Sequence, residues 1–107
     1  DKGLYGDIQP MKVRDYEEFV KDMAFIPLNT DGDSYSVIGL CGEAGEVAEW
    51  VKKSQYRKNP SYTEDLLESE LGDVLHYITR LALNHNFTLK GIMENNYRKL
   101  CARKASK

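Results

Sequence analysis

The sequence has few of the features that mark secreted, membrane-spanning or metal-ribbon proteins. It contains two cysteines, Cys41 and Cys101, and no CxxC pair, which argues against a zinc ribbon and against a thioredoxin-type site. No apolar run approaches the roughly 18 residues that a membrane span needs. Residues 1–10 lack the charged and apolar regions of a signal peptide. We therefore expect a cytoplasmic protein with two free thiols and no membrane partner.

An excess of charge of one sign is also lacking. The chain has 15 Lys and Arg residues against 17 Asp and Glu residues, a net charge of -2. This balance provides no basic stripe, so we expect no nucleic-acid partner. A chain of 107 residues with 41% hydrophobic residues is one globular domain by length and composition. A lone domain of this size buries a modest core, and we therefore expect a homo-oligomer.

Helical periodicity dominates the first half of the chain, and no segment has the pattern of a strand. Apolar side chains recur at helical spacing between about residues 10 and 24. The next segment, FIPLNTDGDS, is rich in turn formers and predicts a break. Asp33 or Ser34 then suits the N-cap of a second helix that ends near Lys53.

The second half of the chain predicts two more helices. Ser61 and Glu64 have the spacing of a capping box, which starts a third helix that ends near Leu83. Thr88 suits the cap of a fourth helix, which ends near Ala102. Four helices with short connections predict an all-α, four-helix-bundle-like domain. We expect this single helical domain to span residues 1–107, with a flexible N-terminal segment at 1–9 and a basic tail at 104–107.

Glutamates recur every three residues in the stretch GLCGEAGEVAEWVKK, residues 39–53. At about 100° per residue, Glu43 falls roughly 100° from the centre of the apolar side and Glu46 falls almost opposite it. A solvated outer face explains both acids taken alone. Three glycines in the same helix weaken that interpretation, because glycine destabilises a helix and leaves room for a close neighbour. The apolar side comprises Val37, Leu40, Cys41, Ala44, Val47, Ala48 and Val51.

A second pair of acids lies on the third helix. Glu70 falls about 70° from the centre of its apolar side, and Asp73 lies slightly beyond. An unpaired carboxylate at the edge of a core is costly, so a salt bridge or a cation must neutralise Glu70. The apolar side comprises Leu67, Leu71, Val74, Leu75, Ile78 and Leu81.

Each of these two helices thus carries two carboxylates on adjacent turns of one face. If the helices pack antiparallel, Glu43, Glu46, Glu70 and Asp73 converge, and four like charges need compensation. An all-oxygen set of ligands suits a hard cation, Mg²⁺ or Mn²⁺, better than zinc. Mg²⁺ readily shares its coordination shell with phosphate oxygens, which points to phosphate chemistry. Glu49 points further round the helix and is either a surface residue or an outer ligand.

Three blocks of the sequence resemble the all-α nucleotide pyrophosphohydrolases, the MazG-like and dimeric dUTPase-like superfamily. GLCGEAGEVAEWVKK is similar to the first motif block, and ESELGDVLHYI is similar to the second. NNYRKLCAR resembles a C-terminal Asn-x-x-Lys-Leu-x-x-Arg pattern, here Asn96, Lys99, Leu100 and Arg103. Many members have two adjacent acids at the start of the first block. This chain has Gly42 before Glu43, as single-domain members with GEAGE often do.

The resemblance implies hydrolysis of a nucleoside triphosphate to the monophosphate and pyrophosphate. It implies that the four motif acids, Glu43, Glu46, Glu70 and Asp73, hold Mg²⁺. It also implies a helical bundle that assembles as a homodimer or homotetramer, with a site that a neighbouring subunit completes in some members. The alternative is a non-catalytic helical module that oligomerises or binds a nucleotide. The intact set of four acids favours the enzyme.

The remaining roles follow from the chemistry of hydrolysis. Glu43 or Glu46 is the candidate base that accepts a proton from the attacking water. The leaving pyrophosphate needs positive donors, for which Lys53, Lys99 and Arg103 are candidates, with Lys99 favoured by its motif position.

Three further residues are candidates for nucleotide binding. Tyr77 lies one turn after Asp73 and suits a contact with phosphate or sugar, or else a place at the core edge. Trp50 suits stacking on a base, or else packing at a subunit interface. Asn96 suits a contact with phosphate or sugar, or else an exposed position on the helix surface.

Overall fold

Every regular element in the part of the chain that the structure describes is helical. The computed structural model describes residues 11–23 and 30–106. The elements in order are α1 (Val13–Met23), α2 (Thr30–Val51), a π-helical turn η1 (Lys52–Tyr56), α3 (Glu64–Asn84) and α4 (Leu89–Ala105). The all-α prediction is confirmed. Residues 1–10, which include the expected N-terminal segment, and Ala24, the expected end of the first helix, lie outside the described residues.

The second helix begins earlier than the sequence predicts. Asp33 and Ser34 lie inside α2, which starts at Thr30, so the predicted N-caps are wrong. The carboxylate of Asp33 accepts a hydrogen bond from Asn84 Nδ2 and lies 2.9 Å from His85 Nε2, and both partners lie at the C-terminal end of α3. A side chain that is bound elsewhere does not compete for the backbone groups of its own helix.

The N-cap of α3 differs from the prediction, and the N-cap of α4 agrees with it. Thr63 caps α3, because its hydroxyl accepts a hydrogen bond from the Leu66 backbone N–H at 3.3 Å. The predicted capping box at Ser61 is therefore wrong, and the Ser61 N–H instead binds Asn59 Oδ1 at 2.9 Å. Thr88 caps α4 as predicted, accepting from the Gly91 N–H at 2.9 Å.

The fourth helix continues through part of the predicted basic tail. α4 ends at Ala105, three residues beyond the predicted end at Ala102. Arg103 and Lys104 thus lie in its last turn, where positive charge interacts favourably with the helix dipole.

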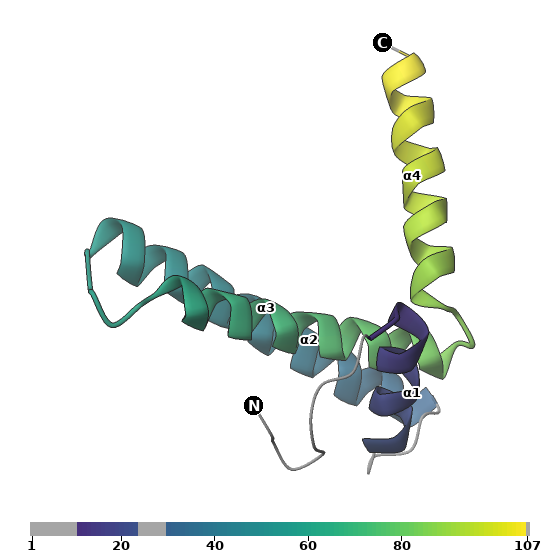
Figure 1. The fold of residues 1–107 in the computed structure, drawn as a ribbon, viewed down its shortest axis with the longest axis horizontal. Helices are drawn as coiled ribbons and strands as arrows, with labels where there is room; N and C mark the ends of the chain where they lie inside the picture. The colour runs from purple at the N-terminus through teal and green to yellow at the C-terminus, as the bar shows by residue number, and fades with distance from the viewer. Residues whose placement is uncertain (1–10, 24–29, 107) are drawn as a thin grey trace.

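Two long helices form the body of the molecule. α2 and α3 run antiparallel along most of their length, and α1 packs against the end of this pair (Figure 1). α4 rises away from the pair and is tied to α1 at its start, where Glu17 Oε2 accepts a hydrogen bond from the Leu89 N–H at 2.7 Å. Within one chain, the fourth helix therefore does not lie along the other long helices.

The hydrophobic core of a single chain is small. Among the described residues, the buried hydrophobic side chains are Val20, Trp50 and Ala82. The accessible surface is 8462 Å², against about 6,100 Å² for a compact monomer of this mass. The radius of gyration is 16.5 Å, against about 13 Å for a compact domain of this length. No helix in the described ranges is long and apolar enough to cross a membrane.

The side of α2 that packs on α3 is rotated from the one that the apolar pattern predicts, of which only Leu40, Val47 and Val51 are half-buried. Val37 is 44% exposed, and Cys41, Ala44 and Ala48 on the same predicted side are also exposed. The side that faces α3 instead includes Ser36 and Trp50, which are buried, with the half-buried Glu43 between them. This rotation of α2 turns a carboxylate toward the neighbouring helix.

Candidate functional site

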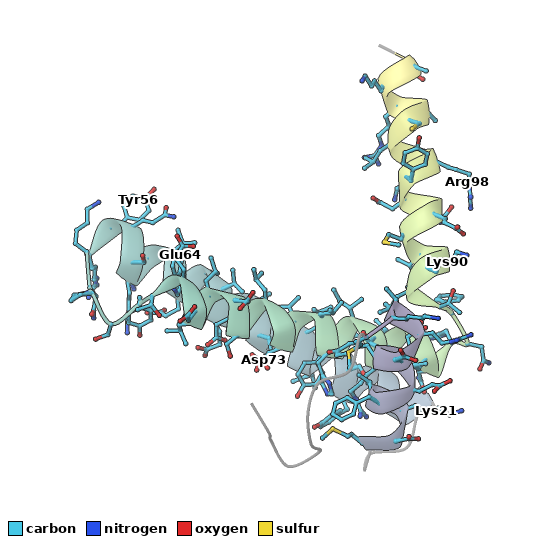
Figure 2. The ribbon with its side chains drawn as sticks, in the orientation of Figure 1. Lys21, Tyr56, Glu64, Asp73, Lys90 and Arg98 are labelled. Atoms are coloured by element: carbon cyan, nitrogen blue, oxygen red, sulfur yellow. The ribbon has the colours of Figure 1, made fainter. Side chains whose placement is uncertain are left out.

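Three of the four predicted metal-binding acids meet between α2 and α3. Glu43, Glu70 and Asp73 each offer one carboxylate oxygen, and these oxygens lie within 4.8 Å of one another. Glu43 and Glu70 are half-buried and Asp73 is exposed. Figure 2 shows Asp73 near the middle of the helix pair. We call Glu43, Glu70 and Asp73 the acid cluster.

The antiparallel pairing explains why these acids converge. Glu70 and Asp73 are three residues apart on α3, so their side chains lie on adjacent turns of one face. Glu43 reaches them because the α3-facing side of α2 carries it toward the pair. The prediction that Glu43 lies well away from the packed side of its helix is therefore wrong.

The other two glutamates of α2 lie outside the acid cluster. Glu46 is exposed, and its negative charge contributes to the electrostatics of Glu43. Glu49 pairs with Lys53 on the next turn, with 3.3 Å between Oε1 and Nζ. The sequence left Glu49 as either a surface residue or an outer ligand. In the structure it lies in a surface ion pair.

The surroundings of Glu43 disfavour its ionised form. Partial burial raises the pKa of Glu43, and the nearby charges of Asp73 and Glu70 raise it further. Such a carboxylate is costly in its ionised form unless a positive charge lies beside it. Carboxylate oxygens are the ligands that hard divalent cations prefer. The residues present therefore fit the metal ion that the sequence implies.

An aromatic group borders the acid cluster on one side. Tyr77 follows Asp73 by one helical turn, and its ring centroid lies 6.0 Å from that of Tyr35 and 5.1 Å from that of His76. A hydrogen bond with Tyr35 and partial burial raise the pKa of Tyr77, so its hydroxyl keeps its proton at neutral pH. Burial lowers the pKa of His76, which favours a neutral ring.

The comparisons with known proteins agree with this site. Residues 35–106 match the MazG nucleotide pyrophosphohydrolase domain. The chain belongs to the MazG family. It is 38% identical over 102 residues to the Gene 37 protein of Mycobacterium phage L5, and this match covers 88% of the chain and 90% of that protein. No solved structure matches the chain. Family membership places the protein among nucleotide pyrophosphohydrolases, and the MazG match includes all three residues of the acid cluster.

Two predicted substrate-binding residues of the MazG domain lie toward the η1 end of the helix pair. Trp50 is 7% exposed, and its indole Nε1 donates a hydrogen bond to the Thr63 carbonyl oxygen at 2.7 Å. Lys53, which pairs with Glu49, also lies over the ring of Tyr62, 5.6 Å from its centroid. In one chain Trp50 therefore joins α2 to the start of α3, and its contact with a base stays a prediction.

The remaining predicted contacts lie on α4, away from the acid cluster. Asn96, Lys99 and Arg103 are all exposed. α4 packs on α1 and rises away from the α2–α3 pair, as the labels of Asp73 and Arg98 show (Figure 2). A single MazG chain thus does not bring these residues to its own acids.

Sequence reasoning missed two tyrosines at the site. Tyr16 on α1 is half-buried, and the negative charge of Asp73 adds to the effect of burial in raising its pKa. Tyr35 contacts Tyr77 from α2. In the sequence, Tyr16 is part of the apolar periodicity of the first helix, so nothing in the sequence indicates that it lies near Asp73. Tyr35 precedes Glu43 by two helical turns, and that spacing was the available signal.

Proposed function

We propose that this protein hydrolyses a nucleoside triphosphate, either an NTP or a dNTP, to the monophosphate and pyrophosphate with Mg²⁺. The observation that carries the proposal is the convergence of Glu43, Glu70 and Asp73, whose carboxylate oxygens lie within 4.8 Å of one another. Mn²⁺ suits the same oxygen ligands. We place the reaction in the cytoplasm, where the exposed free thiols of Cys41 and Cys101 stay reduced.

The acid cluster holds the metal, with Glu46 beside it as the fourth motif acid. When bound, Mg²⁺ supplies positive charge to the phosphates and lowers the pKa of a bound water. The proton of the attacking water would pass to Glu43 or Glu46, because Glu43 belongs to the acid cluster and Glu46 lies on the next turn of α2. Tyr77 binds the nucleotide as a neutral donor, which adds no negative charge beside the phosphates.

The proposed active form is a homodimer or homotetramer. Asn96, Lys99 and Arg103 lie away from the acids of their own chain, so we propose that they bind the triphosphate held by a second copy. The accessible surface, about 2,400 Å² above that of a compact monomer, supports a large interface. Exposed apolar side chains on α4 support it as well, among them Met93 and Leu100.

Charge complementarity favours α4 as the part that reaches the second copy. α2 has five acidic residues and no Lys or Arg, and α3 has five acidic residues and one Arg. α4 has five Lys and Arg residues and one Glu. A basic helix that packs beside an acidic pair in another copy relieves the repulsion in both, and also supplies donors for pyrophosphate.

The test is a panel of NTPs and dNTPs with Mg²⁺, with phosphate measured after addition of an inorganic pyrophosphatase. Asp73→Asn and Glu70→Gln each remove one charge from the acid cluster, and we expect at least a roughly hundredfold loss of kcat. Glu68→Gln, an exposed residue of the same helix, is the matched control and keeps full activity. Mg²⁺ raises the Tm of the wild type and not that of Asp73→Asn.

Two results contradict the proposal. If the folded protein turns over no nucleotide in the panel, it is not this enzyme, and the alternative of a non-catalytic helical module is favoured. If the wild type is active and Asp73→Asn and Glu70→Gln are fully active as well, the metal assignment is refuted. The proposal that the protein is an enzyme then still stands.

A further inference from the structure

The layer of residues next to the acid cluster contains an unusually close contact between α2 and α3. Gly39 precedes Glu43 by one turn on α2, and Tyr77 follows Asp73 by one turn on α3. Because the helices run antiparallel, the two residues meet. A Cβ atom built on Gly39 lies 2.2 Å from Tyr77 Cε1 and 2.5 Å from Cδ1 and Cζ. Cβ atoms in proteins essentially never come closer than 3.0 Å to such neighbours.

The two glycines that follow Gly39 on α2 do not have such a neighbour. A Cβ atom on Gly42 or Gly45 meets nothing within 4 Å among the described residues. The three glycines of the stretch GLCGEAG, Gly39, Gly42 and Gly45, therefore differ in their surroundings. Gly39 alone of these three lets a ring lie directly against the helix backbone.

The ring of Tyr77 is held on further sides. Tyr35 packs against it at an interplanar angle of 57°, and His76 meets it edge-on at 84°. The guanidinium of Arg80 covers the ring of Tyr35, 5.0 Å from its centroid. A ring confined in this way has little freedom to find another rotamer, so a displacement at Gly39 moves the hydroxyl as well.

Tyr77 lies one helical turn from Asp73, and Gly39, against which its ring packs, lies one turn from Glu43. The ring therefore lies in the layer next to the acid cluster, and the charge of Glu43 is among the influences that raise the pKa of Tyr77. The position of the hydroxyl relative to the acids therefore depends on how far the ring sinks into the surface of α2.

We infer that Gly39 is a positioning residue for nucleotide binding. It has no side chain, and this lets the Tyr77 ring lie across α2 with its hydroxyl beside the acid cluster. The inference rests on the proposed function, in which Tyr77 contacts the nucleotide. A methyl group at position 39 pushes the ring outward and weakens nucleotide binding, while the carboxylates that carry out hydrolysis stay in place.

The test compares Gly39→Ala with Gly45→Ala, which adds the same methyl group to the same helix in open space. We expect Gly39→Ala to raise KM about tenfold, the size of one lost hydrogen bond, with kcat little changed. Gly45→Ala keeps the wild-type KM. Alanine stabilises a helix relative to glycine, so Gly45→Ala raises the Tm, whereas Gly39→Ala lowers it because of the clash.

A double variant separates positioning from a general disturbance. In a Tyr77→Ala background the ring is absent, so Gly39→Ala raises the Tm and adds no further increase in KM. This background also keeps the test valid if Gly39→Ala alone fails to fold.

The inference is overturned if Gly39→Ala and Gly45→Ala have the same KM. It is also overturned if Gly39→Ala raises KM further in the Tyr77→Ala background, since Gly39 then acts by another route. A wild type that turns over no nucleotide contradicts the proposed function itself, and this inference falls with it. Wild-type turnover thus distinguishes the two failures.

Discussion

At the scale of single residues, one carboxylate joins α2 to α3 at one end of the helix pair. Asp33 near the start of α2 binds Asn84 and His85 at the end of α3. The hydrogen bond from Asn84 is the main cause that lowers the pKa of Asp33, and the contact with His85 adds to it. The ionised form of Asp33 is therefore favoured in the folded protein relative to the unfolded chain.

This shift predicts a loss of stability in acid. Because the pKa of Asp33 is lowered by folding, its contribution is present above the ordinary value near 4 and is lost as pH falls through the folded value. Asp33→Asn is expected to lower the urea midpoint at pH 7, with a difference from the wild type that shrinks below about pH 4. Asp22→Asn, exposed on α1, is the control. A constant difference across this range contradicts the role of the charge.

Residue spacing predicted the three members of the acid cluster, but the orientation that it predicted for Glu43 is wrong. Glu70 and Asp73 follow from their spacing on one helix face, which needs no tertiary information. The orientation of Glu43 was wrong because the apolar side of α2 was assumed to pack within the chain. Val37, Cys41, Ala44 and Ala48 are exposed instead, so the centre of the hydrophobic pattern of α2 does not coincide with the side that faces α3.

At the scale of whole elements, the caps decide where the helices begin. Thr63 and Ser61 are both good capping residues, and the sequence favoured Ser61 because Glu64 follows it by three. The structure uses Thr63, whose backbone carbonyl also accepts the hydrogen bond from the Trp50 indole. That tertiary contact fixes the start of α3 two residues later than predicted.

The choice of cap gives a paired prediction. Thr63→Ala removes the acceptor for the Leu66 N–H and is expected to lower the free energy of unfolding by about 1 kcal/mol. Ser61→Ala, at an exposed position, is expected to change it by less than about 0.5 kcal/mol. Urea denaturation of the two variants measures both values. A larger loss of unfolding free energy in Ser61→Ala than in Thr63→Ala would indicate that Ser61 is the cap.

The start of α2 shows a limit of turn signals. DGDS has the composition of a turn, and the structure places it in the first turns of a helix. The contact of Asp33 with α3 is distant in sequence, so local composition gives no sign of it.

At the scale of the whole molecule, the central feature is a helix, α4, that packs on α1 at its start and leaves most of its length exposed among the described residues. α4 is exposed along nearly its whole length and carries the basic motif residues Lys99 and Arg103. The proposed oligomer places these residues at the acids of another copy. In that proposal activity requires two chains, because Lys99 and Arg103 lie away from the acid cluster of their own chain.

Mixed oligomers test this arrangement. Asp73→Asn lacks an acid and Arg103→Ala lacks a donor, so each variant alone is expected to be nearly inactive. Mixing the two under conditions that exchange subunits is expected to restore activity, because some sites combine intact acids with an intact α4. Light scattering on each variant confirms that assembly is unchanged. If the mixture stays as inactive as its components, Arg103 acts within its own chain or not at all.

The sequence by itself determined the helical character of the chain, three acids of one cluster and the family. These depend on local periodicity and on short motifs, and both are visible along the chain. Only the tertiary structure decided which side of α2 faces α3, that Thr63 and not Ser61 caps α3, and that Gly39 receives a tyrosine ring. These features depend on residues distant in sequence that meet because the two helices run antiparallel. The three glycines of GLCGEAGEVAEWVKK cannot be told apart in the sequence. Only the fold shows that Gly39 is the one packed against the ring of Tyr77.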